Sequence, residues 1–178
     1  MKRFKALYTL GCSFFDGSCM DERGGDINQK YSHRFSKLLS DKLELKEVNN
    51  SVGGYSNHRI FRTAYDWIIN QSPQTIKETL FIIGITDVAR TDLQLNDGEF
   101  KLGSTPSDMD NIHNDEKEHI SRITKIRGLD IDYFFDLWKN WFKYVYSEDI
   151  RLEETIRDYH LLQNLIKSLG GDVMFLNT

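Results

Sequence analysis

Ser13 is the first residue of the chain whose type and position could support covalent chemistry. It follows an apolar run over residues 4–10 that predicts a buried strand, and Gly11 and Cys12 lie between the run and the serine. In open α/β sheets, ligands bind at the carboxyl ends of the strands, where a serine on a rigid turn can present its hydroxyl to a substrate. We therefore treat Ser13 as a candidate nucleophile.

Two later stretches strengthen this interpretation. A second strand-like run, residues 43–48, leads into Asn-Asn-Ser-Val-Gly-Gly-Tyr-Ser-Asn at residues 49–57. A third run, residues 80–83, leads into a small polar loop at residues 84–87. The glycine pair of the second stretch lets the backbone approach a ligand closely and turn its N–H groups toward it. The chain thus has three predicted strands that end in small or polar residues.

In this order, the three stretches resemble the motif blocks of the SGNH (GDSL-like) hydrolase family. The closest likeness is to the phage and marine-metagenome branch, which writes its first block Gly-Cys-Ser-Phe. The resemblance implies that Ser13 is the nucleophile, that the backbone N–H of Gly54 serves the oxyanion hole, and that Asp87 matches the third-block aspartate. Thr86 stands where the family has asparagine, and Cys12 where it usually has aspartate. One oxyanion donor is worth about 2.7–4 kcal/mol of barrier, so a rotatable hydroxyl in place of a fixed amide predicts low activity.

The fourth block of the family, Asp-x-x-His, supplies the catalytic base after the fourth strand. Residues 173–178 read as that strand, so the resemblance implies a C-terminally truncated reading frame whose histidine lies beyond residue 178. Asp110 and His113 have the same spacing at an earlier place in the chain. They are the alternative base, because a triad is defined by its geometry and not by the order of its residues.

Several residues close to these blocks are predicted to contact a substrate. They are Cys12, Phe14, Asn57, Arg59 and Arg90. For Asn57 and Arg59 the alternative is helix capping and solvation, and for Arg90 it is an ion pair with Asp87 that holds the loop.

The order of the predicted elements is strand, helix, strand, helix, strand, insertion, helices, strand. This order predicts a flavodoxin-like, doubly wound parallel sheet in a three-layer α/β/α domain spanning residues 1–178. Residues 91–127 are polar and poorly periodic and predict an insertion or lid. Helices are expected over residues 30–42 and 58–70, from residue 129 with an aromatic face to 146, and from 147 to the glycines at 170–171. The last helix has eight predicted buried positions: Ile150, Leu152, Ile156, Leu161, Leu162, Leu165, Ile166 and Leu169.

Composition narrows the class of protein. The chain has 178 residues, 39% of them hydrophobic and 28% charged, which is typical of a soluble single domain. A net charge of −4 without a basic stripe argues against nucleic-acid binding, and no apolar run reaches the length of a membrane span. Cys12 and Cys19 are expected to be reduced thiols, which makes the cytoplasm the default location. No cofactor is implied, and no metal, because the spacing of His113, His119 and their acidic neighbours fits no ligand motif.

The resemblance implies hydrolysis of a small ester, an O-acyl or carbohydrate ester, through an acyl-enzyme on Ser13. One alternative is a non-catalytic module with the SGNH fold that binds a glycan or a protein. A second alternative is a phage structural or assembly component. The latter would form a homo-oligomer through the aromatic helix at residues 129–146, with Trp138 and Trp141 in the contact.

Overall fold

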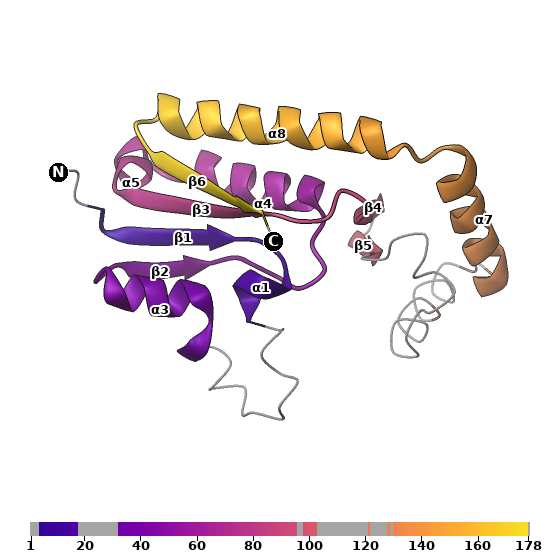
Figure 1. The fold of residues 1–178 in the computed structure, drawn as a ribbon, viewed down its shortest axis with the longest axis horizontal. Coiled ribbons are helices and arrows are strands. Elements are labelled where there is room, and N and C mark those ends of the chain that lie inside the picture. Colours follow the sequence, from indigo (N-terminus) through magenta and orange to yellow (C-terminus); the bar gives the residue numbers. More distant parts are fainter. Residues whose placement is uncertain are drawn as a thin grey trace.

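The computed structural model describes residues 4–17, 32–95, 98–102, 121, 128 and 130–177, with the backbone alone over 91–95 and 98–102. Its centre is a four-stranded parallel sheet in the order β2-β1-β3-β6 (Figure 1). The strands are β1 (Ala6–Leu10), β2 (Lys46–Asn49), β3 (Thr79–Ile85) and β6 (Asp172–Asn177). The predicted α/β class with a parallel sheet is confirmed, and the arrangement is compatible with three α/β/α layers.

The two central strands are apolar on both faces, as expected for a parallel sheet that is covered on both sides. Leu7 of β1 and Ile82 of β3 pack on one face, while Tyr8 and Phe81 pack on the other. The register pairs Thr9 with Asn49 in β2 and Leu10 with Ile83 in β3. The first three strands therefore end at one edge of the sheet.

Helices cover both faces of the sheet (Figure 1). One face carries α1 (Ser13–Asp16) and α3 (Phe35–Lys42), and the other carries α4 (Asn57–Ile69), α5 (Pro73–Lys77) and α8 (Glu148–Ser168). Helix α3 begins later than the predicted residue 30. Strand β2 also begins later than residue 43, because Leu43 and Glu44 end α3. The Leu43 N–H donates to the carbonyl of Leu39, and Glu44 has a φ of 55°.

Helix α4 follows its prediction closely. The Ser56 hydroxyl accepts a hydrogen bond from the Arg59 N–H and caps the helix. Ile60, Ala64 and Ile68 are buried at a spacing of four residues and pack in the main core. The packing of these residues fixes the position of the first turn of α4, which lies at the carboxyl edge of the sheet.

Helix α8 departs from its prediction. Leu162 and Ile166 are buried, as expected, but four other predicted core positions are 47–58% exposed. These four residues are Ile150, Leu152, Ile156 and Leu161. For Ile150, Leu152 and Ile156, Figure 1 shows the reason: the N-terminal half of α8 extends past the carboxyl ends of the strands, so the sheet does not cover it. Leu161 lies in the C-terminal half. The periodicity of the sequence predicts which residues form the apolar face of the helix, but it does not predict how far the sheet extends beneath that face.

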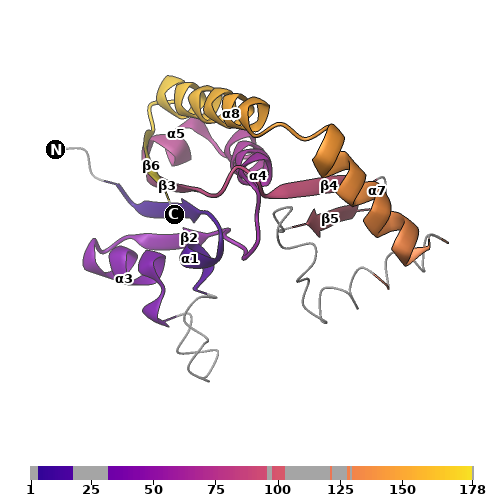
Figure 2. The ribbon, with the colours of Figure 1, turned by 45° about the vertical axis from the view of Figure 1, so that its right-hand side comes forward.

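The predicted insertion at 91–127 begins as a β-hairpin. Strands β4 (Thr91–Leu95) and β5 (Gly98–Leu102) pair antiparallel in a separate sheet. The poorly periodic sequence did not indicate these strands, and the role of the segment as an insertion or lid stays a prediction. The hairpin and α7 (Ile131–Tyr144) lie beyond the carboxyl edge of the main sheet (Figure 2). Residues 103–120 and 122–127 lie outside the described residues. No described helix has the length and apolar character needed to cross a membrane.

Candidate functional site

Ser13 is the first residue of α1, immediately after β1 and a tight turn. The N–H groups of Phe15 and Asp16 donate to the carbonyl of Cys12 at 2.9 and 3.2 Å, and Gly17 ends the turn in the left-handed region. Cys12 is buried, Ser13 is half-buried and Phe14 is 61% exposed. The turn therefore leaves the Ser13 side chain partly open at the sheet edge.

Phe15 anchors this turn by inserting its ring between two glycines. A Cβ atom at Gly11 would lie 2.6 Å from the Phe15 ring, and one at Gly84 would lie 2.7 Å from it. Both distances are shorter than real side chains tolerate, so the close approach requires glycine at both positions. Phe15 is 2% exposed and packs with Leu7 and Ile82. The ring thus ties the first block to the end of β3.

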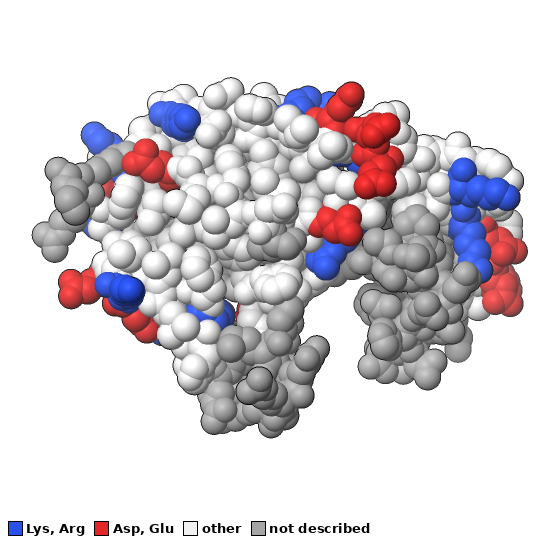
Figure 3. Space-filling view, viewed as in Figure 1, with Lys and Arg blue, Asp and Glu red and all other residues white. Residues whose placement is uncertain are grey.

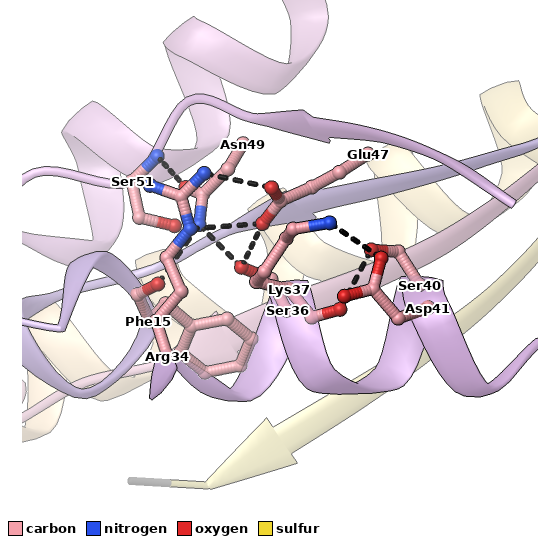
Figure 4. Close-up of polar contacts among 9 residues, drawn as sticks. All are labelled: Phe15, Arg34, Ser36, Lys37, Ser40, Asp41, Glu47, Asn49 and Ser51. Carbon is pink, nitrogen blue, oxygen red and sulfur yellow. Dashed lines mark hydrogen bonds and ion pairs between the residues drawn. The ribbon is translucent and has the colours of Figure 1, made fainter. Parts of the chain in front are cut away.

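A group of hydrogen bonds, which we call the Asn49 cluster, joins the Ser13 turn to the second block (Figure 4). The Asn49 amide donates to the carbonyl of Phe15 at 2.9 Å and to the Ser36 hydroxyl at 2.7 Å, and its oxygen accepts from the Ser51 N–H at 2.8 Å. The Gly53 N–H donates to the carboxylate of Asp16. The cluster fixes the loop after β2 relative to the turn after β1.

An ion pair completes the Asn49 cluster. The Arg34 guanidinium donates to both carboxylate oxygens of Glu47, at 2.9 and 2.8 Å, and the Ser36 hydroxyl donates to one of them (Figure 4). Burial alone would raise the pKa of Glu47, but the hydrogen bonds from Arg34 and Ser36 outweigh burial and lower it. Glu47 is therefore ionised at neutral pH and holds Ser36 in place for Asn49.

Gly54 occupies a conformation that suits glycine. Its φ is +79°, in the left-handed region, and nothing lies within 4 Å of a Cβ atom built on it. Upstream in the same loop, the Val52 N–H donates to the carbonyl of Gly11 at 3.3 Å. The loops of the first and second blocks are therefore joined directly through their backbones. The role of Gly54 as an oxyanion donor stays a prediction.

Asn57 joins the second block to the third. Its amide donates to the carbonyl of Thr86 at 2.8 Å, and its oxygen accepts from the Thr86 N–H at 2.8 Å. The Tyr159 hydroxyl of α8 donates to the carbonyl of Gly84 at 2.7 Å and lies 3.3 Å from the Asn57 oxygen. Asn57 and Thr86 are each 4% exposed. Ser56, and not Asn57, caps α4, so the predicted capping role of Asn57 is wrong.

The loop after Thr86 contains Asp87 and Arg90. An Asp87 carboxylate oxygen accepts from the Ala89 N–H at 2.9 Å, and the Arg90 N–H donates to the Asp87 carbonyl at 3.2 Å. Among the described residues, the two side chains form no ion pair, so the structural alternative for Arg90 is wrong. Arg59 lies over the Tyr55 ring at 4.5 Å. Contact of Arg59, Arg90, Cys12 or Phe14 with a substrate stays a prediction.

A cavity of about 560 Å³, which we call the α8 cavity, lies beside Thr86. Its apolar walls are Ile85, Val88, Leu152, Ile156 and Phe175. Ser13 and Gly54 are not among its lining residues, whereas Thr86 and Asp87 are. A smaller hollow of about 40 Å³ on the other side of Val88 includes Asn57 and Arg90. The sequence did not indicate the cavity, because its lining residues come from β3 and the loop after it, β6 and α8, and no local spacing joins them.

One histidine in the described part of the chain lies close to a carboxylate that the sequence did not predict as its partner. His58 Nδ1 lies 3.5 Å from a carboxylate oxygen of Asp158, and His58 is exposed. In this part of the chain, the Ser13 hydroxyl makes no hydrogen bond with a histidine. Asp110 and His113 lie outside the described residues. No group of three or more His, Cys, Asp or Glu side chains that could hold a metal occurs among the described positions.

The aromatic side chains of α7 are covered unequally: two are buried, while Tyr133 and Tyr144 are 64% and 71% exposed. Trp138 is 4% and Phe142 is 7% exposed, and Trp138 stacks on Trp141 with ring centres 5.0 Å apart. Tyr146, just after the helix, donates a 3.4 Å hydrogen bond from its hydroxyl to the carbonyl of Val88. Trp138 is thus buried within the single chain, and a contact between copies through this helix stays a prediction.

Comparison with known protein families, curated proteins and solved structures finds no match for this chain. The motif resemblance and the geometry above are thus the grounds for a function.

Proposed function

We propose that the chain is a serine hydrolase of the SGNH type, in which Ser13 cleaves a small O-acyl or carbohydrate ester. One observation carries the proposal: the loops that follow β1, β2 and β3 are hydrogen-bonded to one another at a single edge of the sheet. The Val52 N–H donates to the Gly11 carbonyl, and the Asn57 side chain forms hydrogen bonds with both the N–H and the carbonyl of Thr86. Three blocks that are far apart in the sequence are thus joined.

The proposed reaction is acyl transfer to water. The Ser13 hydroxyl attacks the ester carbonyl carbon, the N–H groups of Ser13 and Gly54 with the Thr86 hydroxyl stabilise the oxyanion, and the alcohol leaves. Water then hydrolyses the acyl-enzyme and releases the acid. A histidine takes the serine proton and returns it to the leaving alcohol. The resemblance implies a histidine of an Asp-x-x-His block for this role, and His113 is the candidate within the 178 residues.

The test is the intact mass of the 178-residue chain after incubation with a fluorophosphonate probe. We expect a single adduct that is lost in Ser13→Ala and kept in Ser51→Ala. Ser51 is the comparison, because it lies in the loop of the second block and its hydroxyl oxygen is buried, without a hydrogen-bond partner among the described residues and out of reach of the probe. An adduct that survives Ser13→Ala contradicts the assignment of the nucleophile.

The main alternative, a binding module with the same fold, has support of its own. The α8 cavity is not lined by Ser13, and the Ser13 hydroxyl has no histidine partner in the described part of the chain. A serine without its base loses several powers of ten in rate, about 10⁴-fold or more. No adduct in this chain, followed by an adduct in a chain extended through the next stop codon, supports the hydrolase. No adduct in either chain supports the binding module.

A further inference from the structure

The α8 cavity has the size and wall chemistry of a small-molecule site. It lies between the N-terminal half of α8, the carboxyl end of β6 and the loop after β3. Its volume of about 560 Å³ falls within the range of ligand pockets, roughly 300–1,000 Å³. Figure 3 shows that the surface over the middle of β6, on the face drawn, carries no charged side chains. The cavity itself lies at the carboxyl end of β6, where the carboxylate of Asp87 is among its lining residues.

The walls leave apolar surface that the chain does not cover. Leu152 is 47% and Ile156 is 51% exposed, and both face the cavity together with Phe175. A ligand that removes half-exposed aliphatic side chains from water stabilises the complex by about 25 cal/mol per Å² of apolar surface buried. An elongated aliphatic group matches these walls.

The charge around the cavity limits the class of ligand. Asp87 and His160 are the titratable side chains at the rim in the described part of the chain, beside the neutral amides of Gln163 and Asn177. Tyr159 forms part of the floor, and burial raises the pKa of its hydroxyl, which keeps it neutral. A carboxylate at the mouth repels a second anion, so an uncharged chain is favoured over an acidic one.

Thr86 connects the cavity to the proposed chemistry. It lines the cavity and is also the proposed side-chain donor to the oxyanion. We propose that the α8 cavity binds the acyl chain of a neutral ester, and that Leu152 and Ile156 set the length of chain that is accepted. This inference rests on the proposed hydrolase function, because it names the acyl side of that substrate.

The binding test uses a chain that cannot turn over. In Ser13→Ala with labelled isoleucine methyl groups, we titrate N-methylhexanamide, an unreactive analogue of a six-carbon acyl ester, and record methyl NMR spectra. We expect saturable shifts at Ile85 and Ile156, which line the cavity, and none at Ile150, which is 58% exposed but lies outside it. No saturable shift, or equal shifts at Ile150, overturns the inference.

The specificity test compares two tryptophan variants of α8. Ile156→Trp fills the cavity, while Leu161→Trp places the same ring on a residue of similar exposure, 54%, that does not line it. We measure kcat/KM for p-nitrophenyl hexanoate and p-nitrophenyl acetate in a chain that hydrolyses them. The ratio of hexanoate to acetate should fall about tenfold in Ile156→Trp, and Leu161→Trp should leave it unchanged.

The two tests separate the inference from the function beneath it. Methyl shifts without any hydrolysis that depends on Ser13, in this chain or in the extended one, keep the cavity as a binding site and overturn the hydrolase. Hydrolysis that depends on Ser13, with no methyl shifts and an unchanged ratio in Ile156→Trp, keeps the hydrolase and overturns the acyl pocket.

Discussion

Two asparagines hold the carboxyl edge of the sheet, and they do so in different surroundings. Asn49 lies on the α3 face in a partly exposed cluster that includes the Arg34–Glu47 ion pair. Asn57 lies on the α4 and α8 face, 4% exposed, and bonds only uncharged partners. Both side chains form hydrogen bonds with the backbone of another loop. One of these anchors therefore lies beside charged groups and the other among uncharged ones.

This difference separates what is sensitive to pH from what is not. The Asn49 cluster positions the Ser13 turn and depends on an ionised carboxylate. The Asn57 anchor positions Thr86 through neutral groups and excludes water, so losing it leaves buried backbone groups unsatisfied. We therefore expect the nucleophile side of the site to respond to acid, and the Thr86 side to respond to loss of packing and hydrogen bonds.

The largest effect should come from Asn57→Ala. This variant leaves the N–H and the carbonyl of Thr86 buried without partners, which costs about 3 kcal/mol of unfolding free energy. Asn49→Ala is the matched variant and should cost less, about 1–2 kcal/mol, because Asn49 itself is half-buried, although its partners Phe15 and Ser36 are 2% and 0% exposed. Urea unfolding followed by circular dichroism measures both. Equal losses would remove the distinction between a buried and a half-buried anchor.

Tyr159→Phe tests the same buried anchor from its α8 side. The variant removes the hydroxyl that donates to the Gly84 carbonyl and should cost about 1–2 kcal/mol. Burial raises the pKa of Tyr159, so the folded state keeps it neutral while the unfolded chain ionises near pH 10. The wild-type chain should thus lose stability as the pH rises above about 10, and Tyr159→Phe should lose less over that range. Identical alkaline slopes would contradict the buried hydroxyl.

The sequence predicted the parts of this edge that depend on local pattern. Apolar runs predicted the strands, helical spacing predicted α4, and the rule that parallel strands end at one edge placed the loops with Ser13 and Thr86 together. The Asn57–Thr86 pair joins positions 29 residues apart, so no local spacing indicates it. The exposure of Ile156 likewise depends on where the sheet ends beneath α8. Pattern predicts which side chains are apolar, whereas tertiary geometry decides what covers them.

Glu47→Gln tests the charged anchor. Because the pKa of Glu47 is lowered in the folded state, its contribution to stability is complete above the ordinary carboxyl pKa and is lost as the pH falls through the folded-state value. The variant should cost about 1 kcal/mol at pH 7 and progressively less as the pH falls below the ordinary carboxyl pKa, because the wild type then loses the stabilisation from its ionised Glu47. Urea unfolding across this range measures the difference. A constant difference between the two chains would exclude ionisation of Glu47 as the cause.

Gly54→Ala tests the loop that spans the two anchors, and its effect on stability should be as small as that of Glu47→Gln. A Cβ at φ +79° costs about 1 kcal/mol, and nothing nearby clashes with it. Gly170→Ala is the matched control, with φ +80° at the far end of α8. Both variants should lose similar stability in urea, but only Gly54→Ala should slow labelling of Ser13 by the fluorophosphonate, because a shift of φ turns the Gly54 N–H away from the oxyanion. Equal labelling rates in the two variants would show that Gly54 is needed for the conformation of the loop and not for the reaction of Ser13.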